Sequence, residues 1–336
     1  MQRIILTLGF VFTCALLSAQ DGSFDEHFKA GITFHDAGEY DKAIAEYEKA
    51  MAIDPDVSDV YYEIAYSNFE KGEYEKAVEY CKKSLAIDDK SALACYIVMG
   101  SAEDMLGQPL QALKTYEEGM AKFENYLLYY NYGLTSYNEN LLDQAEEALI
   151  KGITINPDHA SSHLVLSDVM RKRNKRVQAL LSLYYFLLLE PNSERSAIEY
   201  EDLLELLKQG VKKKDEKNID VSIAFDGDSS FSAAELLISM QQATNLAEGN
   251  EDKTDLELFA ERNQAIFSTI AGLDKKGNND DFWWNFYVPS FSDFVEADII
   301  EQLSYYMSLS QGEEARAWFD ENPEKTTKFQ DYFAEE

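Results

Sequence analysis

Basic residues are scarce in this chain of 336 residues. It contains 30 Lys and Arg against 62 Asp and Glu, and the formal net charge is -32. A charge of this sign repels the phosphates of nucleic acids and anionic membrane surfaces. We therefore expect no nucleic acid partner.

Histidine and cysteine are also few, with four and three residues respectively. His159 and His163 are four residues apart, but no third metal ligand accompanies them, so we expect them to pack rather than to bind a metal. Past the first twenty residues only Cys81 and Cys95 remain, and we expect both as free thiols, with a bridge between them as the alternative. No GxSxG, HExxH, P-loop or dinucleotide fingerprint is present. We expect no cofactor, no metal, no catalytic residues and no enzyme activity.

Only one apolar run is long enough to attract attention. It is "IILTLGFVFTCALL" at 4–17, preceded by Arg3 and followed by the small residues of "SAQ" at 18–20. This pattern predicts a signal peptide at 1–20, with an uncleaved anchor as the alternative. We expect an exported protein, periplasmic or secreted, with no transmembrane segment in the mature chain.

The rest of the chain is repetitive. "GEYDKAIAEYEKAMAIDPD" at 38–56 is followed by "GEYEKAVEYCKKSLAIDDK" at 72–90. An alanine recurs at steps of 34, 35, 33 and 34 residues, at Ala43, Ala77, Ala112, Ala145 and Ala179. A small residue lies twelve positions before each, at Gly31, Ala65, Gly100, Gly133 and Ser167. Each unit thus predicts two closely packed helices, and such hairpins must stack to bury their apolar faces.

This pattern resembles the tetratricopeptide repeat family over residues 24–192. The units are 24–57, 58–92, 93–125, 126–159 and 160–192, and the match is looser in the third and fifth. The resemblance implies an all-α fold, a superhelix of about five hairpins whose first helices line a concave groove. It implies a binding scaffold and says almost nothing about the ligand.

The groove positions are rich in aromatic residues. Reading the register of the first helices gives a candidate partner-binding set of Phe28, Tyr62, Tyr66, Phe69, Tyr130 and Tyr137. Tyrosine is a favoured contact residue because its ring is apolar and its tip is polar. The alternative is that some of these rings pack between helices. An aromatic, acidic groove favours an apolar or basic protein or peptide segment as the partner.

The last repeat needs a cover. Its second helix, "ALLSLYYFLLLEP", is apolar on all sides, and a helix of this kind is covered on all sides. We expect a capping helix and joint at 193–218, with Ile198, Leu203, Leu204, Leu206 and Leu207 as part of the cover. The basic cluster "RKRNKR" at 171–176 is expected to be a solvated turn, paired with acidic residues that follow.

The remaining acidic region, 219–336, is predicted to be a mostly helical domain packed on the end of the array. We expect a short strand at 219–225 and helices at 232–249, 254–272, about 292–308 and 312–323. The segment "IAFDGDSS" at 223–230 superficially resembles a phosphatase nucleophile loop, but the strands that such an enzyme needs do not follow. The "FWWNFYVP" segment at 282–289 is expected in the core, because so much apolar area is costly to expose.

These observations favour a non-catalytic, exported scaffold that binds a protein or peptide segment, with a setting in assembly or maintenance of the cell envelope. The alternative is a ligand-binding or hydrolytic C-terminal module, for example for glycans, that the repeats deliver. Exposure of Trp283 and Trp284 would favour this alternative, and their burial would remove its main support.

Overall fold

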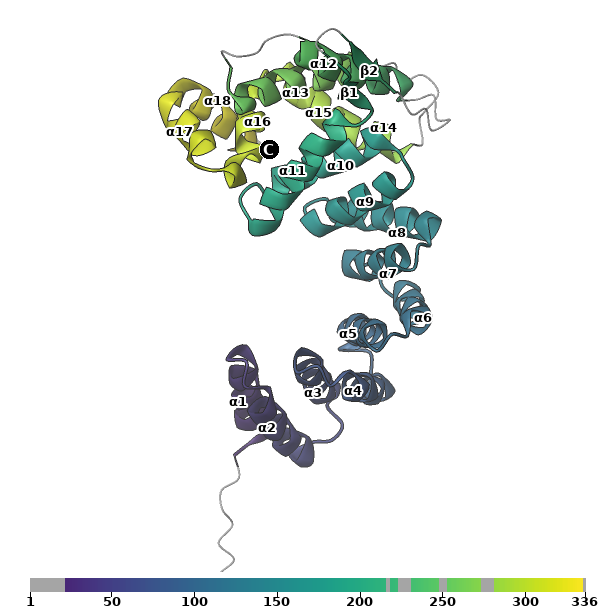
Figure 1. Cartoon of the computed structure of the whole chain (residues 1–336). Helices are drawn as coiled ribbons and strands as arrows, with labels where there is room; N and C mark the ends of the chain where they lie inside the picture. The colour runs from purple at the N-terminus through teal and green to yellow at the C-terminus, as the bar shows by residue number, and fades with distance from the viewer. Residues whose placement is uncertain (1–21, 216–217, 223–230, 248–252, 273–280, 335–336) are drawn as a thin grey trace, which may run out of the picture. The chain divides into compact units, whose positions relative to one another are not determined.

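The computed structural model describes residues 22–215, 218–222, 231–247, 253–272 and 281–334, and the architecture there is helical (Figure 1). The fold class is all-α, as the sequence predicts: antiparallel helix hairpins come first and further helices follow. The expected signal peptide at 1–20 lies outside the described residues. The chain divides into two compact units, residues 1–106 and 107–336, and the boundary falls in the turn of the third expected repeat.

The first unit consists of two complete hairpins and one further helix. Its helices are α1 (Phe24–Asp36), α2 (Tyr40–Ile53), α3 (Ser58–Glu70), α4 (Tyr74–Ile87) and α5 (Ala92–Met105). A capping box starts α1, in which Ser23 accepts from the backbone N–H of Glu26. Gly31 allows the closest approach within a hairpin, because a Cβ atom there would lie 2.3 Å from the ring of Tyr47. This pair explains why a small residue and a large residue recur at these positions of the repeat.

Each hairpin turn contains one residue with left-handed backbone geometry. The residues are Gly38, Gly72, Gly107, Asn140 and Asn174, with φ of 73°, 83°, 71°, 60° and 58°. Each lies five positions before the recurring alanine, so the turn repeats with the same period as the helices. Glycine and asparagine are the residues that adopt this geometry most readily.

The second unit continues the hairpins and then changes character. The hairpin helices are α6 (Pro109–Met120), α7 (Tyr126–Asn138), α8 (Leu142–Ile155), α9 (Ala160–Lys172) and α10 (Arg176–Leu189). The helix α11 (Glu194–Lys208) follows, and a short antiparallel pair, β1 (Val211–Lys213) and β2 (Ile219–Val221), comes next. The last elements are α12 (Ser232–Ala247), α13 (Asp255–Gly272), α14 (Phe282–Asn285), α15 (Tyr287–Glu296), α16 (Ile300–Met307), η1 (Leu309–Gln311), α17 (Glu313–Glu321) and α18 (Pro323–Ala334).

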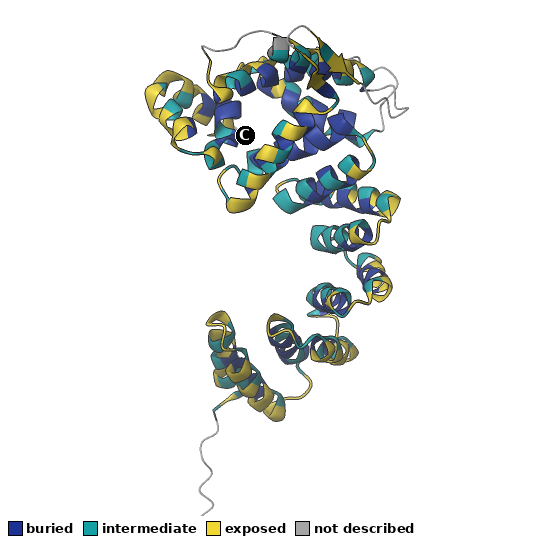
Figure 2. Ribbon diagram, in the orientation of Figure 1, coloured by how far each residue is buried: buried dark blue, intermediate teal, exposed yellow. Residues whose placement is uncertain are grey.

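Helix α10 is at the centre of the core of the second unit. Most of its side chains are buried, and it packs against α9, α11, α12, α15 and α16 (Figure 2). Helix α10 can be apolar on all sides because these neighbouring helices pack around it. On α11, Leu203, Leu206 and Leu207 are buried in this core and Leu204 is partly buried, as predicted. The prediction for Ile198 is wrong: it is 64% exposed, because it lies on the opposite face of α11.

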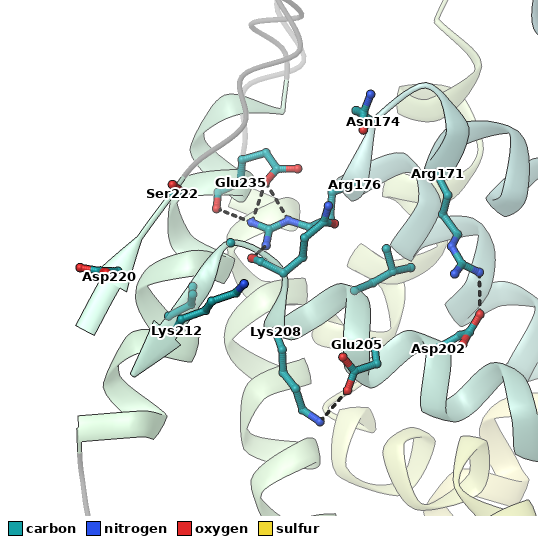
Figure 3. A pocket seen from close by; sticks show the side chains of 14 residues that line it. Arg171, Asn174, Arg176, Asp202, Glu205, Lys208, Lys212, Asp220, Ser222 and Glu235 are labelled. Carbon is teal, nitrogen blue, oxygen red and sulfur yellow. Dashed lines mark hydrogen bonds and ion pairs between the residues drawn. The ribbon is translucent and has the colours of Figure 1, made fainter. Parts of the chain in front are cut away.

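Arg176, at the start of α10, is buried rather than solvated, which corrects the expectation for the basic cluster (Figure 3). Its guanidinium donates to the Glu235 carboxylate on α12 at 2.6 and 2.8 Å, and to Ser239 Oγ at 2.7 Å. It also donates to the carbonyl of Gln209 at 2.7 Å, at the end of α11. The pairing with later acidic residues is therefore as expected, but it takes place in the interior.

The C-terminal helices differ in part from the predicted ones. Helix α13 starts at a capping box, where Glu257 N–H donates to Thr254 Oγ1 and Thr254 N–H donates to the Glu257 carboxylate. The single helix expected at about 292–308 is instead two helices, α15 and α16, separated by a turn at Asp298 with φ of 53°. Helix α18 was not predicted; Pro323 occupies its first position, where a missing N–H costs little.

The "FWWNFYVP" segment is core, as predicted. Trp283 and Trp284 are 5% and 2% exposed, and Trp284 stacks on Phe231 with ring centroids 4.9 Å apart. Tyr287 is fully buried and lies 2.6 Å from Nδ1 of His163 on α9, while Nε2 of His163 lies 2.8 Å from the carbonyl of Pro157. Because a carbonyl can only accept, Nε2 carries the proton and the Tyr287 hydroxyl donates to Nδ1. Burial lowers the pKa of His163 to about 4.

Candidate functional site

The first helices of the hairpins present two separate faces, one in each unit. In the first unit α3 packs against α1 and α5, and in the second unit α7 packs against α9. Helix α11 joins the second face, because Arg195 on α11 donates to Ser161 Oγ on α9 at 2.9 Å. We call these surfaces the α1–α3–α5 face and the α7–α9–α11 face.

Four of the predicted site residues lie on the α1–α3–α5 face. Phe28, Tyr62, Tyr66 and Phe69 are all partly buried, so each ring shares its surface between the protein and solvent. Tyr62 and Tyr66 are stacked with centroids 6.1 Å apart, and Tyr66 lies 4.7 Å from the ring of His35. The structure thus brings these two tyrosines together, in a row that continues to α1.

The other two aromatic residues of this face are supported by their own hairpins. Phe28 lies 5.7 Å from Tyr47, and Phe69 lies edge-on to Tyr74 at 5.6 Å. The alternative interpretation, in which the rings pack between helices, therefore holds in part for both. Their exposed edges are held in fixed positions by these contacts.

The hydroxyls of the α1–α3–α5 face stay protonated. Burial raises the pKa of Tyr62 and of Tyr66, and nearby carboxylates raise it further. Burial also raises the pKa of Glu63, which accepts from Tyr47 Oη at 3.4 Å. A neutral tyrosine can both donate and accept, so this face offers apolar area together with hydroxyl groups that suit a peptide backbone.

Tyr130 and Tyr137 lie on the α7–α9–α11 face. Both are partly buried against the core of the second unit, as is Leu134 between them. Tyr130 meets the ring of His159 edge-on at 4.7 Å. The ammonium of Lys172 lies 3.7 Å from the centroid of Tyr137, so a cation of the protein already occupies one face of that ring.

The second face also carries carboxylates. Arg171 on α9 donates to Asp202 on α11 at 2.7 Å (Figure 3). It also donates to Asp168 at 3.4 Å. One guanidinium thus serves two carboxylates. Burial raises the pKa of Asp168, and the nearby Asp202 raises it further, while Arg171 lowers it. Glu199 on α11 belongs to the same group of charges.

A polar cavity of about 1110 Å³ lies next to this face, between α11, α12 and the strand pair (Figure 3). Its charged lining residues pair with one another: Arg171 with Asp202, Arg176 with Glu235, and Lys208 with Glu205. Lys212 and Asp220 are opposite each other across the strand pair. The cavity is therefore balanced in charge and does not indicate a charged ligand.

Neither a metal site nor a membrane helix is found in the described part of the chain. Over these residues, no three His, Cys, Asp or Glu side chains are placed to hold a metal ion. No helix among them has both the length and the hydropathy that crossing a membrane requires. The "IAFDGDSS" segment lies outside the described residues.

Models of protein families match part of the helix hairpins. A model described as "TPR repeat" matches residues 31–72, and a model described as "Tetratricopeptide repeat" matches 58–91 and 126–159. Residues 31–91 and 126–159 are tetratricopeptide repeats. The matched ranges cover most of the first predicted unit, nearly all of the second and all of the fourth, where the sequence pattern is strongest.

Comparison with solved structures gives several similar chains. PilF of Pseudomonas aeruginosa is 22% identical with a TM-score of 0.49, covering 55% of this chain and 84% of its own. YrrB, described as a TPR protein with an unusual peptide-binding site, is 20% identical with a TM-score of 0.42, covering 52% and 90%. PilW, described as a type IV pilus biogenesis factor, is 15% identical with a TM-score of 0.43, covering 78% and 97%. The comparison with curated proteins gives no match.

Sequence reasoning missed the contribution of α11 to the second face. Arg195, Glu199 and Asp202 are spaced by four and three residues, so they share one side of this helix. Extending the register of the first helices by 34 residues past the fifth repeat gives Arg195, Ile198 and Asp202, and Glu199 directly follows Ile198. Only the apolar side of α11 entered the prediction.

Proposed function

We propose that this protein is a non-catalytic scaffold that binds a protein or peptide segment through the α1–α3–α5 and α7–α9–α11 faces. The observation that carries the proposal is the row formed by Tyr62 and Tyr66. Both rings remain partly exposed on a repeat architecture that presents extended binding surfaces. Large aromatic groups that are positioned by their neighbours lose little entropy on binding.

The test is capture of a native partner by variants of the mature chain. Replacing Tyr62 and Tyr66 together by alanine should abolish capture of proteins from an extract of the source cells. Replacing Tyr130 by alanine tests the second face separately. Capture that is unchanged in all of these variants would contradict the proposal.

A matched control is available on the second helix of the same repeat. Tyr80 on α4 is also partly buried, and it contacts Tyr61 and the ammonium of Lys83. Tyr80→Ala should capture partners as the wild type does, with the same helical circular dichroism. Loss of capture in Tyr80→Ala as well would indicate general destabilisation instead of a lost binding surface.

We further propose that the protein is exported and acts in the periplasm or outside the cell, in assembly or maintenance of the envelope. The Arg3-led apolar run at 4–17, followed by small residues at 18–20, supports this setting. N-terminal sequencing of the mature protein should show a start close to residue 21. A mature protein that retains residues 1–20 would contradict export by a cleaved signal.

The alternative of a glycan-binding or hydrolytic C-terminal module has lost its main support. Trp283 and Trp284 are buried against neighbouring rings and offer no platform for a sugar. The proposal therefore assigns the C-terminal helices to covering the end of the repeats.

A further inference from the structure

The carboxylate of Glu199 is an unpaired acidic group on the α7–α9–α11 face. It is half-buried on α11, and across the described ranges no hydrogen bond or ion pair to this carboxylate is formed. Ion-pairing groups that are half-buried normally have a partner, because burial disfavours a lone charge. The position therefore favours a cation that the chain itself does not supply.

The two arginines nearest to Glu199 are already engaged. Arg171 donates to Asp202 and Asp168, as described above. Arg195 donates through Nε to Glu190 Oε1 at 2.6 Å and through Nη1 to Ser161 Oγ at 2.9 Å. Neither forms an ion pair with Glu199, so negative charge is in excess around this position.

Apolar side chains also lie on α9 and α11. Leu164 lies one turn before Asp168 on α9 and is partly buried against the core. Ile198, the immediate neighbour of Glu199, is 64% exposed. Ile198 lies three residues after Arg195 and four before Asp202, so it is next to both on the surface of α11. The exposed isoleucine contributes nothing to the core, and its position is suited to contact a partner.

We propose that the α7–α9–α11 face binds a Lys or Arg side chain of an otherwise apolar peptide segment, and that Glu199 is the residue that selects this cation. The inference rests on the proposed function, because it names the chemistry of the partner at one of the two faces. The occupant follows from charge complementarity: the Glu199 carboxylate forms no ion pair with any described residue, and the apolar side chains of Leu164 and Ile198 lie on the same two helices, α9 and α11. Long basic side chains have the same combination of an apolar stem and a charged tip.

Binding of this kind depends on pH near neutrality. Burial and the nearby Asp168 and Asp202 raise the pKa of Glu199 to about 7, while Arg171 and Arg195 lower it. These four groups, from α9 and α11, are the charges that act on it most strongly. A cation binds the ionised form, and the ionised fraction falls about tenfold between pH 8 and pH 6 for a pKa of 7. Affinity for a basic segment should fall by about the same factor.

The test is selection of random 12-residue peptides displayed on phage against the full mature chain at pH 8. Three immobilised proteins are compared: wild type, Glu199→Gln, and the control Glu201→Gln, an exposed acid on the same helix. Wild type and Glu201→Gln should select peptides with one Lys or Arg beside apolar residues. Glu199→Gln should select apolar peptides without this basic enrichment.

Affinities of one selected peptide then make the test quantitative. The Glu199→Gln variant should bind this peptide about tenfold or more weakly. Replacing the basic residue of the peptide by glutamine should have the same effect. The two changes together should weaken binding little more than either change alone. Equal basic enrichment with wild type and Glu199→Gln would overturn the inference and leave the proposed function standing. A wild-type chain that selects no peptides would overturn the proposed function, and the inference with it.

Discussion

Replacing Arg176 by methionine should strongly destabilise the second unit. The guanidinium donates to the Glu235 carboxylate, to Ser239 Oγ and to the backbone carbonyls of Gln209 and Glu235. Both side chains of the ion pair are almost wholly buried, at 8% and 13% exposed. Removing one partner leaves a buried carboxylate without its cation, which typically costs about 3 to 5 kcal/mol.

The contribution of the ion pair can be separated from that of the carbonyls. In the double variant R176M/E235L no buried charge is left unpaired, and the main loss is the hydrogen bonds to the two carbonyls, about 1 kcal/mol each. We therefore expect the double variant to lose about 2 kcal/mol and to be more stable than R176M. As a control, K208M breaks a pair whose side chains are 47% and 75% exposed, and it should change stability by less than about 0.5 kcal/mol.

Tryptophan fluorescence during urea unfolding is a selective assay for this prediction. The three tryptophans are Trp283, Trp284 and Trp318, all in the second unit, so unfolding of the first unit does not contribute to the signal. A loss below about 1 kcal/mol in R176M, or a double variant less stable than R176M, would refute the argument. Either result would mean that α10, α11 and α12 are held together by their apolar contacts alone.

Three further predictions concern other parts of the chain. The contribution of neutral His163 to the free energy of unfolding should be fully present above pH 6.5 and should fall by up to about 3 kcal/mol as the pH drops toward 4. The reason is that His163 stays neutral in the folded protein, whereas in the unfolded chain it takes up a proton. Urea midpoints measured from pH 7 to 4 should show this decrease in the wild type, and the H163Q variant should lack it. Gly133→Ala should destabilise by about 1 to 3 kcal/mol, since its methyl group would lie 2.7 Å from a buried leucine, while Gly152→Ala, whose nearest contact is an ordinary 3.4 Å, should be neutral or stabilising in thermal unfolding. Cys81 and Cys95 should react with a thiol label only after denaturation, and mass spectrometry that finds no label on the unfolded, unreduced chain would show a bridge instead.

The hairpins could be predicted because their determinants repeat along the sequence. A small residue such as Gly31 and a large one such as Tyr47 are in contact and recur at a fixed spacing. Each further repeat with this spacing therefore supports the helix assignment of the other repeats. The left-handed turns follow the same period, yet Asn140 and Asn174 take the place of glycine there, so a search for glycine alone finds only part of them. Periodic features are predictable from sequence because they depend on neighbours in the same unit.

The parts that could not be predicted depend on contacts distant in sequence. Arg176 belongs to a run of charges that suggests a solvated turn. Its burial is favourable only because it pairs with Glu235, which lies 59 residues later in the sequence. Helices α15 and α16 read as one helix because the turn at Asp298 adopts a left-handed geometry that the local pattern does not specify. Likewise, the exposure of Ile198 depends on which side of α11 packs on α10, and both sides contain apolar residues.

The cover of the last repeat and the chemistry of the second face are therefore linked through one helix. The apolar surface of α10 requires α11 to pack with Leu203, Leu206 and Leu207 inward. This orientation leaves Arg195 and Ile198 exposed and Glu199 half-buried at the edge of the buried side. Closing the core thus leaves an acidic, partly apolar edge beyond the repeats, and under the proposed function a change in the capping helix should alter partner choice without changing any tetratricopeptide unit.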